Sequence, residues 1–143
     1  MQGGDRRGTR GHAVVEIALM SPWIFLLFIG IFDFGFYAYA GIATANAARV
    51  AALYTSYDIS TATDSAGACS YALEELRKLP NTRTLTNCSA LPVTVTAELW
   101  NVAGEPSTRV TVTYQTVPLI PIPGFAPTAT ITRRAIMRVN PSI

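Results

Sequence analysis

Two acidic residues, Glu16 and Asp33, lie in the most apolar part of this sequence. The residues between them, 17–32, carry no charge. An acidic side chain near the centre of a bilayer-spanning helix costs about 2.5–3.5 kcal/mol on insertion scales, so such a residue usually serves a function. Both positions therefore suggest contact with a partner inside or at the edge of a membrane.

The apolar run is long enough to cross a bilayer. Half of the 143 residues are hydrophobic, only 14% are charged, and the mean hydropathy is +0.30. A helix over residues 17–40 would rise about 36 Å, which exceeds a hydrocarbon core of about 30 Å. Arg6, Arg7 and Arg10 precede the run, so the N-terminus is expected in the cytoplasm. The net charge of +2 is too small to indicate a nucleic-acid partner.

Composition divides the chain into three predicted segments. Residues 1–11 form a glycine-rich, basic cytoplasmic leader, residues 12–57 a transmembrane and stem helix, and residues 58–143 an extracytoplasmic domain. Pro22 removes a backbone donor and predicts a kink that a membrane helix can tolerate. Small residues at three- and four-residue spacings would allow a partner helix to approach the stem closely. They are Ala38, Gly41, Ala45, Ala48 and Ala52.

The outer segment has an α+β pattern. A short helix is predicted over residues 69–79, where Pro80 ends it. Alternating valine and threonine predicts strands over residues 92–102, 108–117 and 128–139. The proline-rich residues 118–127 are expected to form a loop. A small antiparallel sheet with one apolar face needs a cover, and the short helix is the candidate.

Two cysteines, Cys69 and Cys88, lie in this outer segment. In an oxidising compartment the pair predicts one disulfide, whereas two unpaired buried thiols are the alternative. Only two cysteines are present, and the sole histidine, His12, lies on the other side of the membrane. These residues argue against a zinc site, and we expect no cofactor.

The residues argue against an enzyme. Without a histidine, the outer segment cannot assemble a Ser-His or Cys-His pair. Lys78 is interpreted as part of a solvated helix face, and the adjacent Glu74 and Glu75 would point about 100° apart on a helix. Arg133 and Arg134 form a small basic spot, which is typical of an edge strand that resists aggregation.

A cut between Gly11 and His12 would explain Glu16. It would create an α-amine with a pKa of about 7.7–8.0, which is largely cationic at pH 7. The amine would stand one helical turn from Glu16, or it would reach the Glu16 of a neighbouring subunit. A carboxylate in lipid would then have a countercharge.

This arrangement resembles type IV prepilins, in which a basic leader ends in Gly and Glu follows at the fifth mature position. About a third of the chain resembles TadE-like proteins, pseudopilins of the tight-adherence (Tad/Flp) pilus. His12 departs from the apolar or small residue that is more usual at the first mature position. The matching features are the Arg/Gly leader, Val-Glu-x-Ala-Leu at 15–19, Pro22, the Gly30–Gly35 stretch with acidic-Phe-Gly at 33–35, and Asn-Ala-Ala-Arg at 46–49.

The resemblance implies a minor pilin or pseudopilin that serves pilus biogenesis and surface adherence. Its implied partners are other pilin helices, a prepilin peptidase and an inner-membrane assembly platform. The implied location is the bacterial inner membrane, with the outer domain periplasmic or, in the assembled pilus, at the cell surface. Asp33 would contact a partner helix or the platform, and a solvated boundary residue is its alternative interpretation.

Two other interpretations remain open. The "AYA" at residues 38–40 would suit a signal-peptide cleavage before Gly41, which would release a secreted domain. A single-pass anchor for a periplasmic binding domain would explain the hydrophobicity but not Glu16 or Asp33. The mature N-terminal residue distinguishes the three: Gly41 for a signal peptide, Met1 for an anchor and His12 for a pseudopilin.

Overall fold

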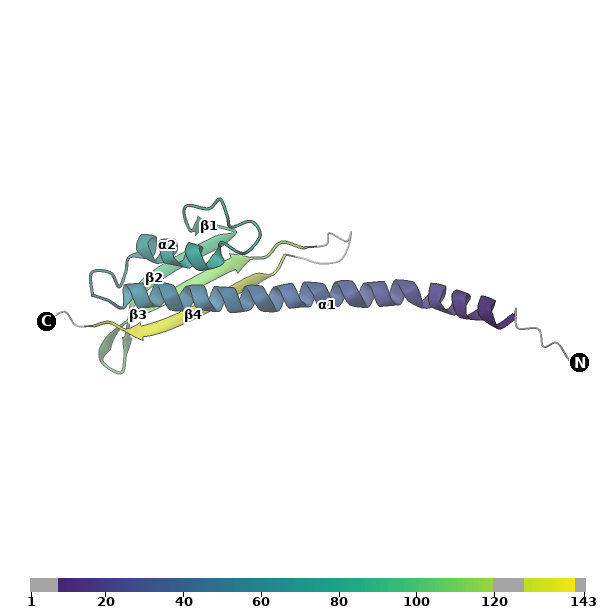
Figure 1. Ribbon diagram of the computed structural model, residues 1–143. Helices are drawn as coiled ribbons and strands as arrows, with labels where there is room; N and C mark the ends of the chain where they lie inside the picture. Colours follow the sequence, from purple (N-terminus) through teal and green to yellow (C-terminus); the bar gives the residue numbers. More distant parts are fainter. Residues whose placement is uncertain (1–7, 120–127, 141–143) are drawn as a thin grey trace, which may run out of the picture. The chain divides into compact units, whose positions relative to one another are not determined.

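A computed structural model describes residues 8–119 and 128–140 (Figure 1). Its elements in chain order are α1 (Gly8–Thr55), α2 (Ser65–Leu76), β1 (Ser89–Ala90), β2 (Val93–Val102), β3 (Glu105–Gln115) and β4 (Thr130–Arg138). The chain forms two compact units, which meet at the bond between Gly35 and Phe36. Because α1 continues through this bond, each unit contains part of the same helix.

The first unit contains the N-terminal part of α1. Every residue from 12 to 28 is exposed, although most of them are large and apolar. Pro22 lies inside the helix. The described part of α1 includes a segment, His12–Thr55, that is long and apolar enough to cross a membrane. A helix that is apolar on all sides and uncovered by protein is typical of a membrane anchor.

The start of α1 differs from the sequence prediction. The helix begins at Gly8 rather than near residue 12, so the Gly11–His12 bond is helical in the uncut chain. Each residue added to a formed helix adds one backbone hydrogen bond. A glycine in the helix costs only about 1 kcal/mol relative to alanine, so Gly8 and Gly11 do not prevent the helix from extending to residue 8. The predicted C-terminal end near residue 57 is correct to within two residues.

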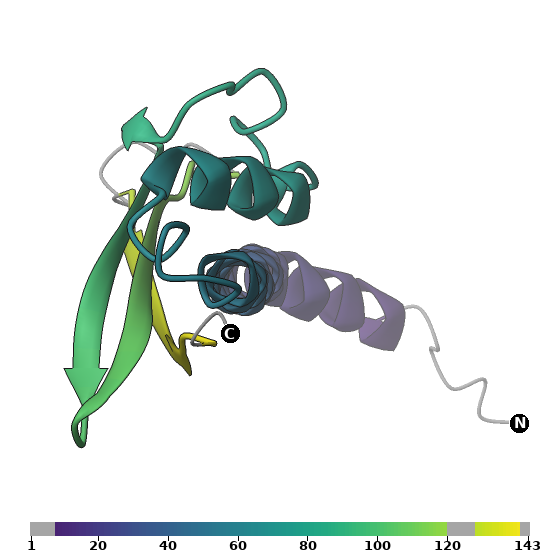
Figure 2. The same cartoon turned by 90° about the vertical axis from the view of Figure 1, so that its left-hand side faces the viewer.

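The second unit is a two-layer α+β structure, as predicted. Its four strands form an antiparallel sheet in the order β1-β2-β3-β4. Figure 2 shows α2 and the C-terminal part of α1 on the same face of this sheet. The alternating valines and Tyr114 point into the core between the layers, together with leucines of α2 and alanines of α1. The buried sheet residues are Val93, Val95, Val110, Val112 and Tyr114.

One additional strand and the bounds of two elements in this unit correct the prediction. The sheet has four strands rather than three, because the two-residue β1 pairs with β2. Helix α2 spans Ser65–Leu76 rather than 69–79. It begins earlier because the Asp64 carboxylate accepts hydrogen bonds from two backbone amides of the first turn. Strand β3 begins at Glu105 instead of residue 108, immediately after the tight turn. Residues 120–127 of the predicted loop lie outside the described residues.

The small residues of the stem mainly pack within this unit. One face of α1 is fully or almost fully buried, and it consists of Ala40, Thr44, Ala47, Ala48, Ala51, Ala52 and Thr55. The Thr44 hydroxyl donates to the Ala40 carbonyl at 2.7 Å, which satisfies its polar group in the core. The predicted partner-helix stripe is therefore wrong for Ala48 and Ala52, because the chain's own fold already covers them.

Candidate functional site

The first candidate site is the apolar helix around Glu16. This residue lies in a shallow groove on the surface of α1, and residues three and four apart line a single face of a helix. The groove is lined by Ala13, Glu16, Ile17, Met20 and Ile24. The carboxylate is thus surrounded by aliphatic side chains that lipid or another helix would cover.

Neither acid of the apolar run has an ionic partner among the described residues. The ion pairs among the described residues are Glu74–Arg77 and Glu98–Arg109, and both lie in the second unit. His12, one turn before Glu16, is exposed. None of the described ion pairs gives Glu16 a countercharge, and a new amine at His12 is the one that the cleavage hypothesis would add.

A second hollow lies further along the same helix. Gly30 is open, because a Cβ atom there would meet nothing within 4 Å. The hollow is lined by Trp23, Leu26, Leu27, Gly30, Ile31 and Phe34. A glycine between large apolar side chains is a place where a neighbouring helix can insert a side chain. Asp33 is half-buried close to this hollow, but does not line it.

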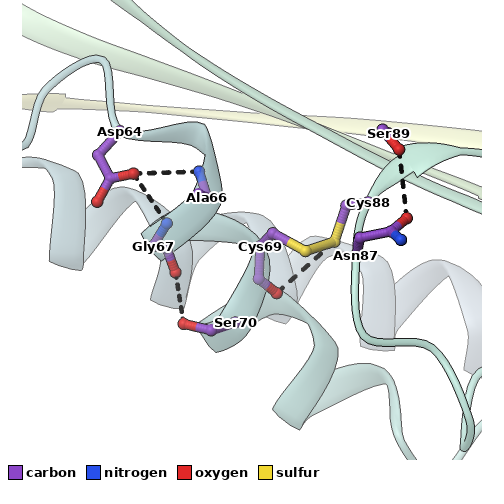
Figure 3. Close-up of a disulfide and its surroundings, with 8 residues drawn as sticks. All are labelled: Asp64, Ala66, Gly67, Cys69, Ser70, Asn87, Cys88 and Ser89. Carbon is purple, nitrogen blue, oxygen red and sulfur yellow. Dashed lines mark hydrogen bonds between the residues drawn. A yellow bond between two sulfur atoms is a disulfide. The ribbon is translucent and has the colours of Figure 1, made fainter.

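A polar cluster fixes α2 to the end of α1. Asp64 accepts from the Ala66 and Gly67 amides at 3.1 and 2.9 Å (Figure 3) and from the Tyr54 hydroxyl at 2.7 Å. The Gly67 amide and the Tyr54 hydroxyl hold the pKa of the Asp64 carboxyl below its ordinary value. Tyr54 also stacks on Tyr71 with ring centroids 4.8 Å apart. The arrangement is structural, and sequence reasoning missed it.

The disulfide between Cys69 and Cys88 is present (Figure 3), as predicted. It joins α2 to the segment before β1, which has little regular structure of its own. Both cysteines are buried. The Ser89 hydroxyl donates to the Asn87 side-chain oxygen at 3.2 Å, next to the bridge.

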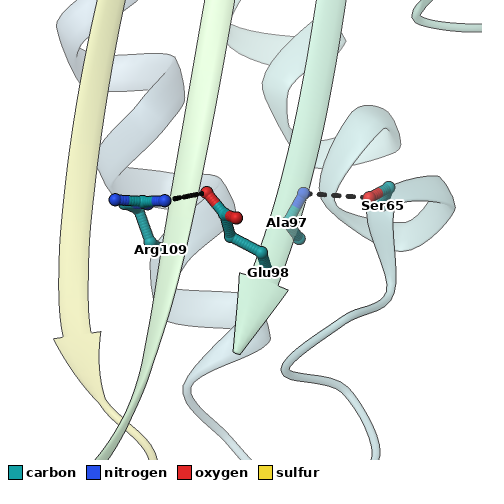
Figure 4. Close-up of polar contacts among 4 residues, drawn as sticks. All are labelled: Ser65, Ala97, Glu98 and Arg109. Carbon is teal, nitrogen blue, oxygen red and sulfur yellow. Dashed lines mark hydrogen bonds and ion pairs between the residues drawn. The ribbon is translucent and has the colours of Figure 1, made fainter. Parts of the chain in front are cut away.

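The open face of the sheet carries a charged and aromatic cluster. Arg109 contacts the Glu98 carboxylate at 2.6 Å (Figure 4), and its guanidinium lies 3.6 Å from the centre of the Trp100 ring. Counting back from the Ala103–Gly104 turn places Glu98 opposite Arg109. That count was available from the sequence, but the pair was not predicted.

The residues weighed for catalysis lie apart on the surface. Glu74 pairs with Arg77 at 3.2 Å in an exposed i,i+3 contact, and Lys78 is exposed. Arg133 and Arg134 lie on β4. Among the described residues, no group of three or more His, Cys, Asp or Glu side chains could hold a metal ion.

The long apolar helix joined to a small disulfide-bonded α+β unit is typical of a membrane-anchored protein. Residues 11–53 match the family described as TadE-like protein. The N-terminal segment is therefore similar to TadE-like proteins, as its motifs predict. The matched residues contain the Gly11–His12 bond, both acids and most of the buried alanine face. No curated protein and no solved structure gives a significant match.

Proposed function

We propose that this protein is a minor pilin or pseudopilin of a Tad-type pilus, with a role in assembly rather than in catalysis. The observation that carries the proposal is the TadE-like match, because it coincides with the exposed apolar helix that bears Glu16. The protein would wait in the bacterial inner membrane with its N-terminus in the cytoplasm and its α+β unit in the periplasm. It would reach the cell surface only in an assembled pilus.

Processing would create a positive countercharge for the Glu16 carboxylate. A prepilin peptidase would cut the Gly11–His12 bond and free the amine of His12. Four helical residues span about 6 Å along the axis, so this amine would lie one turn from the carboxylate. The amine is largely cationic near pH 7 and would neutralise Glu16 of the same chain or of a neighbouring subunit.

Assembly would bring the exposed part of α1 against other pilin helices. The grooves at Glu16 and Gly30 lie before Ala40, where the chain's own fold begins to cover the helix. Asp33 would contact a partner helix or the inner-membrane assembly platform. The α+β unit would remain outside the membrane and face outward.

The test replaces Glu16 and a neighbour in the same groove. Glu16→Ala should insert into the membrane normally but fail to support piliation, because the incoming amine has no carboxylate to pair with. Met20→Ala removes apolar surface from that groove without removing charge, and it should assemble. Normal piliation by Glu16→Ala would contradict the proposal.

Processing has a separate test. Gly11→Val should block the cut and leave a protein about 1 kDa heavier by mass spectrometry, because the leader has 11 of the 143 residues of a 15.4 kDa chain. Sequencing of the mature wild-type N-terminus should begin at His12. A start at Met1 would favour a simple anchor for a periplasmic binding domain. A start at Gly41 would indicate a signal peptide, whose removal would also take the fully buried Ala40 out of the core.

A further inference from the structure

The burial of α1 locates the membrane surface along the helix. The α+β unit packs on α1 from Phe36 and buries one face of it fully from Ala40 onward, so lipid can surround completely only the residues before Phe36. Residues 12–39 would rise about 42 Å. A bilayer with its headgroup layers is about 40–45 Å thick. Gly41 therefore falls at the headgroup layer on the side of the domain.

Aromatic residues support this position. Tyr39 is 47% exposed, and Phe36 and Tyr37 precede it with ring centroids 6.1 Å apart. Tyrosine is enriched at membrane–water interfaces, where its ring lies at the level of the headgroups. The helix thus changes from a lipid-covered to a domain-covered surface within a few residues.

One basic side chain of the sheet reaches this level. Arg133 lies on β4, opposite Val112 of β3, and its side chain is exposed. A Cβ atom on Gly41 would be 3.6 Å from the Arg133 Nη2 atom, so the guanidinium lies beside α1 at residue 41. The neighbouring Arg134 belongs to the opposite face of β4, because successive strand residues alternate.

Arg133 has donors to offer there. Its Nη1 donates to the Thr132 carbonyl at 3.3 Å. Neither ion pair among the described residues uses Arg133. A guanidinium carries five N–H donors in a planar fork, and this fork matches the oxygens of a phosphate. The position and the chemistry therefore point to the same ligand.

We propose that Arg133 binds the phosphate of an anionic phospholipid headgroup in the leaflet next to the domain. The contact would hold β4 against the membrane surface while the subunit waits in the bilayer. The proposal requires membrane anchoring but no cleavage and no pilus partner.

Hydrogen exchange tests this contact on the full uncut chain in lipid nanodiscs. In wild type, the amides of β4 should exchange at least twofold more slowly in phosphatidylglycerol discs than in phosphatidylcholine discs. Arg133→Gln should remove that difference. Arg134→Gln, which removes the same charge from the opposite face, should keep it. Circular dichroism would verify that both variants fold.

A second measurement makes the result specific to the headgroup. In phosphatidylglycerol bilayers, solid-state NMR dephasing between arginine ¹³Cζ and lipid ³¹P should fall in Arg133→Gln by more than in Arg134→Gln. Inorganic phosphate added to phosphatidylcholine discs should not restore the slow exchange of β4. The proposal is overturned by a wild type without lipid dependence, by equal losses in both variants, or by full protection from inorganic phosphate alone. Each of these outcomes would leave the pilus role untouched.

Discussion

Breaking the Cys69–Cys88 disulfide should measurably destabilise the outer unit. The two residues are 19 apart in sequence, so the bond closes a loop of about 20 residues. In the chain-entropy model such a loop lowers the entropy of the unfolded chain by about 11 cal/mol/K, which corresponds to about 3 kcal/mol at 25 °C. The loop includes residues 77–88, which follow α2 without a helix or strand. The bond therefore adds to the burial of Leu79 and Thr82, which also hold this segment.

The assay is thermal unfolding of the full chain in detergent micelles, followed by near-UV circular dichroism. A change of 1 kcal/mol shifts the Tm of a domain of about 100 residues by about 4 °C or more. Reductant should consequently lower the Tm by about 12 °C. A Cys69→Ser, Cys88→Ser double variant should match the reduced wild type and should not respond to reductant.

Two results would refute this reasoning. The first is an identical Tm for the oxidised and the reduced wild type, which would mean that the loop is ordered without the bond. The second is alkylation of both thiols in the native, unreduced protein, which would mean that the bond is absent.

Three further predictions concern the same unit. Gly67→Ala should destabilise it by about 1–3 kcal/mol in chemical denaturation, because the new methyl would lie within 3.0 Å of the Tyr54 ring; Gly41→Ala meets only an ordinary contact and serves as the control. The Gly67 amide and the Tyr54 hydroxyl lower the pKa of Asp64, so the ionised carboxylate should stabilise the fold above about pH 4 and lose this effect as the pH falls through the folded-state pKa. Asp64→Asn should therefore make the free energy of unfolding depend less on pH in acid. Burial raises the pKa of Tyr114 to about 12, so stability should fall as the pH rises from about 10, where the unfolded tyrosine ionises. Tyr114→Phe should reduce that fall in alkaline unfolding curves and leave the smaller part that comes from Tyr54, whose pKa is raised by its hydrogen bond to Asp64.

The main elements could be predicted because their signals extend over many residues. An uncharged run that is long enough to cross a bilayer is expected to form a helix, because a helix satisfies its backbone hydrogen bonds internally, and α1 is that helix. The alternation of valine with threonine placed Val110 and Val112 in the core correctly. The disulfide followed from the number of cysteines and their expected compartment.

The missed features depend on tertiary context. Asp64 lies in a stretch rich in Ser, Thr and Asp, and such residues suit loops as well as helix caps. Strand β1 has two residues, too few for any periodicity. Leu99 continues the inward alternation of β2 but is 51% exposed, because the sequence does not reveal where the cover of the sheet ends.

The candidate site was predictable only in its residue types. Glu16 and Asp33 are conspicuous in an apolar run, but neither belongs to an ion pair among the described residues, so the chain itself does not show what they would contact. The alanines of the stem have the same composition whether they face a neighbouring helix or the chain's own sheet. Only the burial of Ala48 and Ala52 showed that these alanines face the chain's own sheet.

The division of α1 at Ala40 has a consequence for how this subunit tolerates change. Residues 12–28 are exposed, whereas the alanine face is buried in the interior of the folded unit. On the proposed pilus role, exchanging residues 12–35 with those of a related pilin should change which filament accepts the protein without affecting its folding. Enlarging Ala47 or Ala51 should instead disrupt folding, because both side chains are fully buried, and the protein would be degraded before it could assemble.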